Sequence, residues 1–170
     1  MLIALTGTPG TGKSCVAAEL ALRGYHIIRV NDTIGPYILE RDEDQDTNII
    51  DTERWSAEFP EHEGVVEGHL SHLLRADRII VLRCRPDVLK KRLEMRGYQP
   101  EKVSENVEAE MLDVVLVESL EEHTPEKIYE IDATVMSVSE LADVIGMIIV
   151  GQAEPGYGKV DWLEVCADLL

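Results

Sequence analysis

Short apolar runs alternate with longer segments of helical periodicity along most of this chain. The apolar runs, at residues 2–6, 25–30, 64–68, 77–83 and 127–132, have the length and composition of buried strands. Elsewhere apolar residues recur every three or four positions, which predicts helices. These helices span residues 14–22, 87–95, about 101–120, and from Ser137 or Ser139 to Val150. Strands that alternate with helices predict an α/β fold, in which helices cover both faces of a parallel sheet.

Residues 33–63 interrupt this alternation because they are polar and acidic. Apolar side chains are nevertheless spaced through them, which favours an ordered insert over a partly disordered excursion. We predict a small helical insert that closes over a second substrate. The tail, residues 151–170, is glycine-rich but carries an apolar set that can dock on the body: Val160, Trp162, Leu163 and Val165.

The composition is that of one globular domain of 170 residues, with 45% hydrophobic and 29% charged residues. No apolar run approaches the roughly 20 residues that cross a bilayer, and no basic leader precedes the first strand. Cys15, Cys84 and Cys166 show neither paired nor metal-ligand spacing, which is typical of free thiols. We therefore expect a cytoplasmic protein without a membrane anchor.

The formal net charge of -17 disfavours strong direct binding to nucleic acid, which needs the opposite sign. It indicates either a solvated acidic surface or one that attracts a basic protein partner. The charge is uneven, because residues 40–63 hold ten acidic and two basic side chains. Residues 75–96, in contrast, hold eight of the 16 basic residues, and we expect them to bind a polyanionic small molecule.

A glycine-rich loop lies directly between the first predicted strand and the first predicted helix. It matches the pattern Gly-x4-Gly-Lys-Ser in Gly7-Thr8-Pro9-Gly10-Thr11-Gly12-Lys13-Ser14. In such a loop, consecutive backbone N–H groups and the start of the helix bind phosphates. Lys13 is expected to reach the β- and γ-phosphates, and the Ser14 hydroxyl to bind Mg²⁺. The sequence therefore predicts a site for ATP and Mg²⁺.

Four further residues are candidates for the chemistry. Glu67 ends a predicted strand and can hold Mg²⁺ as the acidic residue of such sites. His69 is either a phosphate or water contact or merely an exposed histidine, and with His72 it lacks a third metal ligand. Arg92 and Arg96 are four residues apart and share a helix face. They form either a clamp for the transferring phosphoryl group or a solvated basic face.

Four stretches together resemble the adenylate kinase isoenzyme 6 family, and more narrowly its archaeal members. They are residues 7–14, Val66-Glu67-Gly68-His69, Val81-Leu82-Arg83-Cys84-Arg85-Pro86, and Arg92-Leu93-Glu94-Met95-Arg96-Gly97-Tyr98. The resemblance covers most of residues 1–150, and its most specific part is Arg-Leu-Glu-x-Arg-Gly-Tyr. It implies a nucleoside monophosphate kinase core with a five-stranded parallel sheet. It also implies a monophosphate-binding insert at about 31–53 and a lid at about 95–105.

The resemblance also implies roles for individual residues. The ATP contacts that it implies are Gly10, Thr11, Gly12, Lys13, Ser14, Cys15 and Arg96. From the residues themselves, the candidate catalytic residues are Lys13, Glu67, His69 and Arg92, with Ser14 and Glu67 at the metal. Members commonly have Asp-x-His where this chain has Glu67-Gly68-His69.

The activity implied by the resemblance is transfer of a phosphoryl group from ATP to AMP or another monophosphate, together with ATP hydrolysis. The family also acts in maturation of the small ribosomal subunit, by transient binding of the eleventh small-subunit ribosomal protein. That protein has a basic tail, which the acidic surface of this chain would suit. Two alternatives stay open: an ATPase assembly switch with little kinase activity, and a P-loop kinase for another small metabolite.

Overall fold

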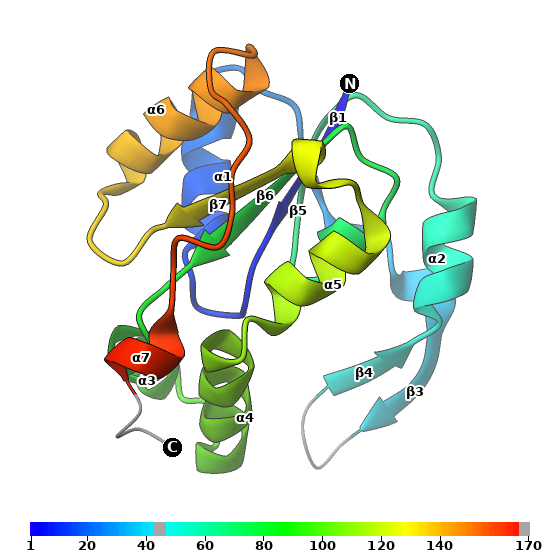
Figure 1. The fold of residues 1–170 in the computed structure, drawn as a ribbon. Helices are drawn as coiled ribbons and strands as arrows, with labels where there is room; N and C mark the ends of the chain where they lie inside the picture. Colours follow the sequence, from blue (N-terminus) through cyan, green and yellow to red (C-terminus); the bar gives the residue numbers. More distant parts are fainter. Residues whose placement is uncertain (43–46, 167–170) are drawn as a thin grey trace.

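The centre of the molecule is a parallel sheet of five strands (Figure 1). The structure is a computed structural model, and it describes residues 1–42 and 47–166. In spatial order the strands are β2 (Ile27–Arg29), β5 (Gly64–Glu67), β1 (Leu2–Thr6), β6 (Arg78–Arg83) and β7 (Ile128–Asp132). The predicted α/β fold is confirmed, and each predicted strand is present with its ends shifted by two residues or fewer.

The central strand β1 is buried along its whole length because helices cover both faces of the sheet. Alternate residues of a strand point to opposite faces. Ile3 and Leu5 therefore pack beneath α1 (Lys13–Leu22) and α6 (Val138–Ile149), whereas Leu2 and Ala4 pack on the opposite face. That face is covered by α5 (Val114–Glu122) and α2 (Thr52–Glu58). Of the two predicted caps for α6, the structure uses Ser137.

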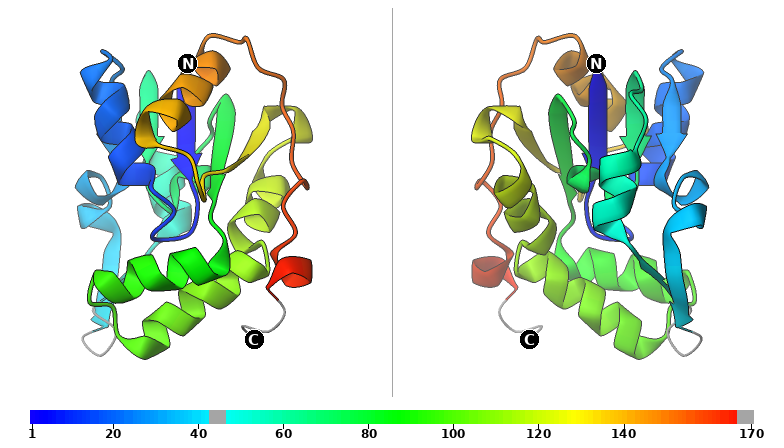
Figure 2. Two further views of the ribbon diagram at one scale, coloured as in Figure 1. Left: turned by 90° about the vertical axis from the view of Figure 1, so that its left-hand side faces the viewer. Right: turned by 90° about the vertical axis from the view of Figure 1, so that its right-hand side faces the viewer.

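A pair of helices lies across the end of the sheet at which the strands finish (Figure 2). They are α3 (Pro86–Met95) and α4 (Pro100–Met111), joined by a tight turn that includes Gly97. Their apolar faces form a third core cluster, in which Leu89 and Leu93 meet Val103 and Val107. The predicted lid segment, residues 95–105, thus consists of this turn and the first half of α4.

The single helix predicted over residues 101–120 is wrong, because the chain breaks between α4 and α5. At the break Asp113 adopts a left-handed conformation with φ of 56°, and its carboxylate pairs with Arg83. The physical reason is tertiary: Val107 packs in the third cluster, while Leu116 packs under the sheet in the second. One straight helix cannot turn its apolar side toward both.

The described part of the insert, residues 33–42 and 47–63, has regular secondary structure as predicted, but it combines strands with a helix. It contains an antiparallel hairpin of β3 (Ile38–Asp42) and β4 (Thr47–Ile50), followed by α2. Trp55 anchors α2, since its ring is fully buried and its Nε1 donates a hydrogen bond to Thr33 Oγ1 at 3.0 Å. Residues 43–46, part of the acidic run at 40–63, lie outside the described residues. The described residues also form short 3-10 helices at Val30–Asp32, Gly35–Tyr37, Ser71–Leu73 and Pro125–Lys127.

The carboxyl-terminal segment runs back along the edge of the sheet and ends on the α3–α4 pair. Gly156 forms a parallel bridge with Tyr129 of β7, and the short helix α7 (Trp162–Val165) follows. Trp162 is buried and Val160 packs beside it in the third cluster, so their predicted docking is confirmed. Leu163 and Val165 are exposed, and their predicted docking is wrong. Within residues 1–42 and 47–166, no helix has the length and apolarity to cross a bilayer.

Candidate active site

The glycine-rich loop connects β1 to α1 at the carboxyl end of the central strand. Two of its glycines are required by their surroundings. Gly10 has φ of 94°, and a Cβ there would lie 2.7 Å from Leu89 Cδ1. Gly7 has φ of 139°, and its Cβ would lie 2.4 Å from the carbonyl oxygen of Leu82. A side chain at either position would be strained and would push the loop away from the core.

The start of α1 offers an anion site. Within the described residues, no side chain caps the helix at Gly12, so the first-turn N–H groups of Lys13, Ser14 and Cys15 face outward. The Cys15 side chain is exposed. Cys15 can therefore contribute to phosphate binding through its backbone N–H. The hydroxyl of Thr11 donates to Thr8 O at 2.9 Å, so this side chain shapes the loop.

Lys13 lies folded against the loop. Its side chain is 7% exposed, and its Nζ donates to the carbonyl oxygens of Gly7 at 2.7 Å and Thr8 at 2.9 Å. Desolvation by burial lowers the pKa of Lys13 to about 8, although the carboxylates of Glu67 and Glu110 act in the opposite direction. At pH 7 the amine is therefore mainly protonated and can exchange two carbonyl partners for phosphate oxygens.

Ser14 and Glu67, the two residues that the sequence predicted at a metal, are in direct contact. The Ser14 hydroxyl donates to Glu67 Oε1 at 2.8 Å, so a glutamate at this position still reaches the loop. Serine and carboxylate oxygens are suited to Mg²⁺, which usually completes its shell with water and phosphate. Among the described residues, no group of three acidic, histidine or cysteine side chains is arranged to hold a metal ion.

The two histidines after β5 have different surroundings. His69 is exposed to the cleft, where partial desolvation and the nearby charge of Lys13 lower its pKa, so that it is neutral at pH 7. His72 is buried, and its ring nitrogens lie 3.0 Å from Thr6 Oγ1 and 3.0 Å from Glu118 Oε2. Because both nitrogens of His72 are occupied, the pair is not arranged to hold a metal.

The structure separates the two arginines of the predicted clamp. Arg96 lies in the turn after α3 and lines the cleft together with Tyr98. The Arg92 guanidinium lies 3.4 Å from the carbonyl oxygen of Gly10 and 3.3 Å from that of Thr134, outside the set of residues that line the cleft. Residues four apart share a face only within a continuous helix. Arg96 lies just after the end of α3, so the turn sets the direction of its side chain, and only Arg96 lines the cleft.

One cleft of about 910 Å³ unites these elements. The loop and Glu67 form one end, and the insert and the α4–α5 region form the walls. The wall residues beyond the loop include Arg29, Asn31, Ile34, Asn48, Ile50, Leu70, Lys102, Asn106, Val115 and Glu118. This volume is near the upper end of the range for small-molecule sites. A smaller hollow of about 680 Å³, around Met1 and Asp77, lies at the amino ends of the strands, away from the loop.

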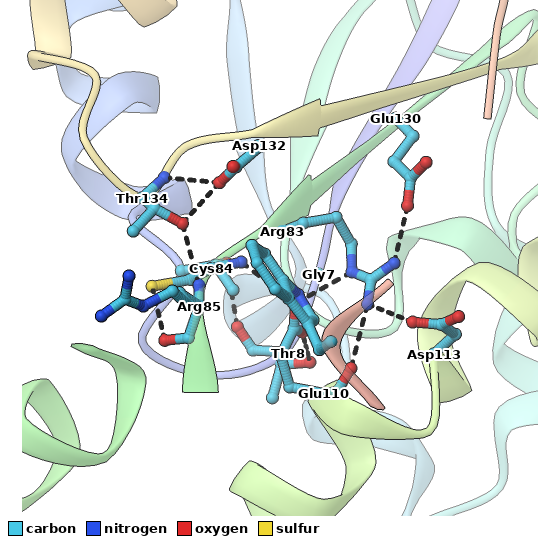
Figure 3. A network of polar contacts seen from close by, with 12 residues as sticks. Gly7, Thr8, Arg83, Cys84, Arg85, Glu110, Asp113, Glu130, Asp132 and Thr134 are labelled. Carbon is cyan, nitrogen blue, oxygen red and sulfur yellow. Dashed lines mark hydrogen bonds and ion pairs between the residues drawn. The ribbon is translucent and has the colours of Figure 1, made fainter. Parts of the chain in front are cut away.

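A buried polar cluster next to the loop was not predicted from the sequence (Figure 3). Glu110 of α4 is 2% exposed and accepts a hydrogen bond from Thr8 Oγ1 at 2.5 Å. It also pairs with Arg83 of β6, whose guanidinium reaches Glu130 and Asp113 as well. The available signal was the position of Glu110 three residues after Val107 and one before Met111, on an otherwise apolar helix face.

Comparisons with known proteins agree with this geometry. Residues 3–113 match the family model AAA_18, described as an AAA domain. A protein named "Putative adenylate kinase" from Archaeoglobus fulgidus is 50% identical over 172 residues, which cover 99% of this chain and 95% of that protein. A protein of the same name from Methanocaldococcus jannaschii is 44% identical, over 100% of this chain and 97% of its own.

Two solved structures share the fold at low sequence identity. A gluconokinase from Sinorhizobium meliloti has a TM-score of 0.56 at 18% identity, covering 88% of this chain and 91% of its own. The YorR protein from Bacillus subtilis, solved in complex with phosphorylated GDP, has a TM-score of 0.52 at 21% identity, covering 88% and 96%. They support the P-loop α/β fold alone. The nearly full-length archaeal matches and the family model together show that this chain belongs to the AAA_18 family and to the archaeal proteins named putative adenylate kinase, a group of adenylate-kinase-like P-loop kinases.

Proposed function

We propose that the protein is a nucleoside monophosphate kinase, which transfers the γ-phosphoryl group of ATP to AMP or a related monophosphate. The observation that carries the proposal is the single cleft of about 910 Å³, with a phosphate loop at one end and space beyond it. A site for one nucleotide would need only the loop end. The names of the archaeal relatives support the same reaction.

On the donor side, the backbone N–H groups of Gly10, Gly12 and the first turn of α1 bind the phosphates of ATP. Lys13 leaves the carbonyl oxygens of Gly7 and Thr8 and pairs with the β- and γ-phosphates. Ser14 and Glu67 would hold Mg²⁺, which neutralises phosphate charge. The two are already in contact at 2.8 Å, so little rearrangement is needed.

Around the transferring group, Arg96 supplies positive charge from the turn between α3 and α4. Residues 95–105 act as the lid, since Arg96, Tyr98 and Lys102 line the cleft and closure of this segment would exclude water. Arg92 supports the loop from outside through the carbonyl of Gly10. The reaction needs no covalent intermediate, because catalysis consists of alignment and charge stabilisation.

The acceptor occupies the far end of the cleft, between residues 31–53 and α5. Arg29, at the end of β2, is placed to pair with the acceptor phosphate. Ile34, Ile50 and Val115 offer apolar surface for a base. The three free thiols suit a reducing compartment such as the cytoplasm, which also supplies both nucleotides.

A coupled assay of ADP formation tests the proposal. Wild-type protein with ATP and Mg²⁺ is expected to form ADP much faster when AMP is added, and Lys13→Ala is expected to form none. A panel of AMP, CMP, UMP and GMP then gives the preferred acceptor. Turnover that none of these monophosphates increases would refute the kinase function, and acceleration by another phosphate acceptor would favour a small-metabolite kinase.

ATP hydrolysis is the second candidate, favoured by the position of His69. This neutral side chain faces the cleft near Lys13, where it can orient a water when no acceptor is bound. A role in ribosome maturation rests on the resemblance to the adenylate kinase isoenzyme 6 family and on the net charge of -17. This role requires that the protein bind the eleventh small-subunit ribosomal protein and that the binding weaken with salt. A pull-down at low and at high ionic strength measures both.

A further inference from the structure

The carboxylate of Glu110 is buried where four separate parts of the chain meet. Besides Thr8 Oγ1 at 2.5 Å, it accepts hydrogen bonds from Arg83 Nε at 2.9 Å, Cys84 N at 3.0 Å and Trp162 Nε1 at 3.1 Å. These donors come from the phosphate loop, from β6 and the residue that follows it, and from the carboxyl-terminal segment. Glu110 itself belongs to α4, which carries the second half of the lid.

Stability alone is a weak explanation for this cluster. A buried ion pair often stabilises a protein no more than apolar side chains of the same volume would, because both charges lose their hydration. Here one arginine faces the carboxylates of Glu110, Glu130 and Asp113, an arrangement that adds further desolvation cost. Such a cluster is better explained by the geometry that it fixes.

Thr8 is the residue whose geometry is fixed. Its hydroxyl donates to Glu110, and its carbonyl oxygen accepts hydrogen bonds from Lys13 Nζ at 2.9 Å and Thr11 Oγ1 at 2.9 Å. The Thr11 backbone N–H donates to the same oxygen at 3.3 Å. The Thr8 side chain therefore sets the position of the carbonyl that holds the loop and its lysine.

Trp162 connects the carboxyl-terminal segment to the same loop by two routes. Its indole N–H is one of the four donors to Glu110. Its ring packs in the third core cluster with Leu89 and Leu93, and these two leucines are the nearest neighbours of a Cβ built on Gly10. The segment thus contacts both the polar and the apolar support of the loop.

We propose that Glu110 is a positioning residue for the phosphate-binding loop, acting through Thr8, and that Trp162 makes the carboxyl-terminal segment part of this support. The inference rests on the ATP-binding half of the proposed function and not on the identity of the acceptor. It assigns to residues that do not themselves line the cleft an effect on ATP affinity and on the alignment of Lys13.

The test uses Glu110→Gln together with Glu130→Gln as a matched control. Both substitutions remove one buried carboxylate from the same arginine, and the Glu130 side chain is 1% exposed. Only Glu110 contacts the loop. We expect Glu110→Gln to weaken MgATP binding, measured by calorimetry, by roughly tenfold, the loss typical of a hydrogen bond to a charged group. Glu130→Gln is expected to lower the melting temperature while the dissociation constant for MgATP changes by less than about twofold.

Thr8 supplies a second, milder pair of variants that keeps the test valid if Glu110→Gln does not fold. Thr8→Val removes the hydroxyl and is expected to weaken MgATP binding about as much as Glu110→Gln. Thr8→Ser keeps the hydroxyl and is expected to bind MgATP about as tightly as the wild-type protein. Combining Thr8→Val with Glu110→Gln should add little further loss, because both break the same contact.

The tail is tested by Trp162→Phe, which keeps an aromatic ring but loses the N–H donor. We expect a roughly threefold weaker MgATP complex, with Leu163→Ala, at an exposed neighbour, as the control without effect. Unchanged MgATP affinity in both Thr8→Val and Glu110→Gln would overturn the inference, as would an equal loss in Glu130→Gln. Failure of the wild-type protein to bind MgATP would instead refute the proposed function itself.

Discussion

Replacing Lys13 by methionine is expected to abolish phosphoryl transfer and, at the same time, to make the protein more stable. The amine is buried, and desolvation lowers its pKa from 10.5 to about 8. At about 1.36 kcal/mol per pKa unit, keeping this lysine charged costs the folded state about 3 kcal/mol at pH 7. The two hydrogen bonds to Gly7 and Thr8 offset part of that cost, at about 1 kcal/mol each.

Methionine has a similar length without the charge, so Lys13→Met loses both hydrogen bonds and the desolvation cost together. The net expectation is a gain of about 1 kcal/mol, or about 2–4 °C in melting temperature for a domain of this size. Lys90→Met, on the exposed side of α3, is the control for loss of one surface lysine. Thermal and urea denaturation at pH 7 measure the difference.

The pH dependence gives the same reasoning a second test. Below pH 8 the amine is protonated in both the folded and the unfolded state, and the full cost is present. Between pH 8 and 10.5 the unfolded state binds more protons, so wild-type stability rises with pH relative to Lys13→Met. Above pH 10.5 the cost is gone. The reasoning is refuted if Lys13→Met is less stable than wild type at pH 7 and the difference in their free energies of unfolding does not change with pH. Burial of this charge would then not be costly.

Four other outcomes follow from the site. Glu67→Gln is expected to raise the Mg²⁺ concentration for half-maximal activity at least tenfold, measured by metal titration, because it weakens an oxygen ligand; an unchanged midpoint would remove Glu67 from the metal site. Arg96→Ala should lower kcat by about a hundredfold and Arg92→Ala by much less, since only Arg96 lines the cleft; equal losses in steady-state assays would contradict this division. His69→Ala should reduce ATP hydrolysis more than transfer to AMP, and equal losses in the two assays would argue against water positioning. Iodoacetamide should modify exposed Cys15 before the buried cysteines, and MgATP should protect it, as mass spectrometry of tryptic peptides can show; no protection would place the phosphates elsewhere.

Local sequence determined the strands and the loop because their signals come from neighbours in the chain. Five apolar runs gave the five strands, and glycine spacing with Lys13 and Ser14 gave the phosphate loop. Ser14 and Glu67 lie in contact because β1 and β5 pair in parallel, which brings their carboxyl ends together. None of these features depends on how distant helices pack.

Other features depended on contacts between distant residues, and sequence periodicity could not reveal them. The break at Asp113 exists because α4 and α5 pack on different core clusters, and the insert contains a hairpin in addition to the helix α2. The position of Arg92, outside the residues that line the cleft, depends on contacts such as that with the carbonyl of Gly10, 82 residues away. Glu110 is the clearest case: its helical spacing from Val107 and Met111 places it on the apolar face of α4, but nothing near it in the sequence identifies its partners. Only the fold brings Thr8, Arg83 and Trp162 around it, because a buried charge needs partners that several separate elements must supply. The sequence by itself thus determined the fold class and the phosphate loop, and the tertiary structure decided what holds that loop in place.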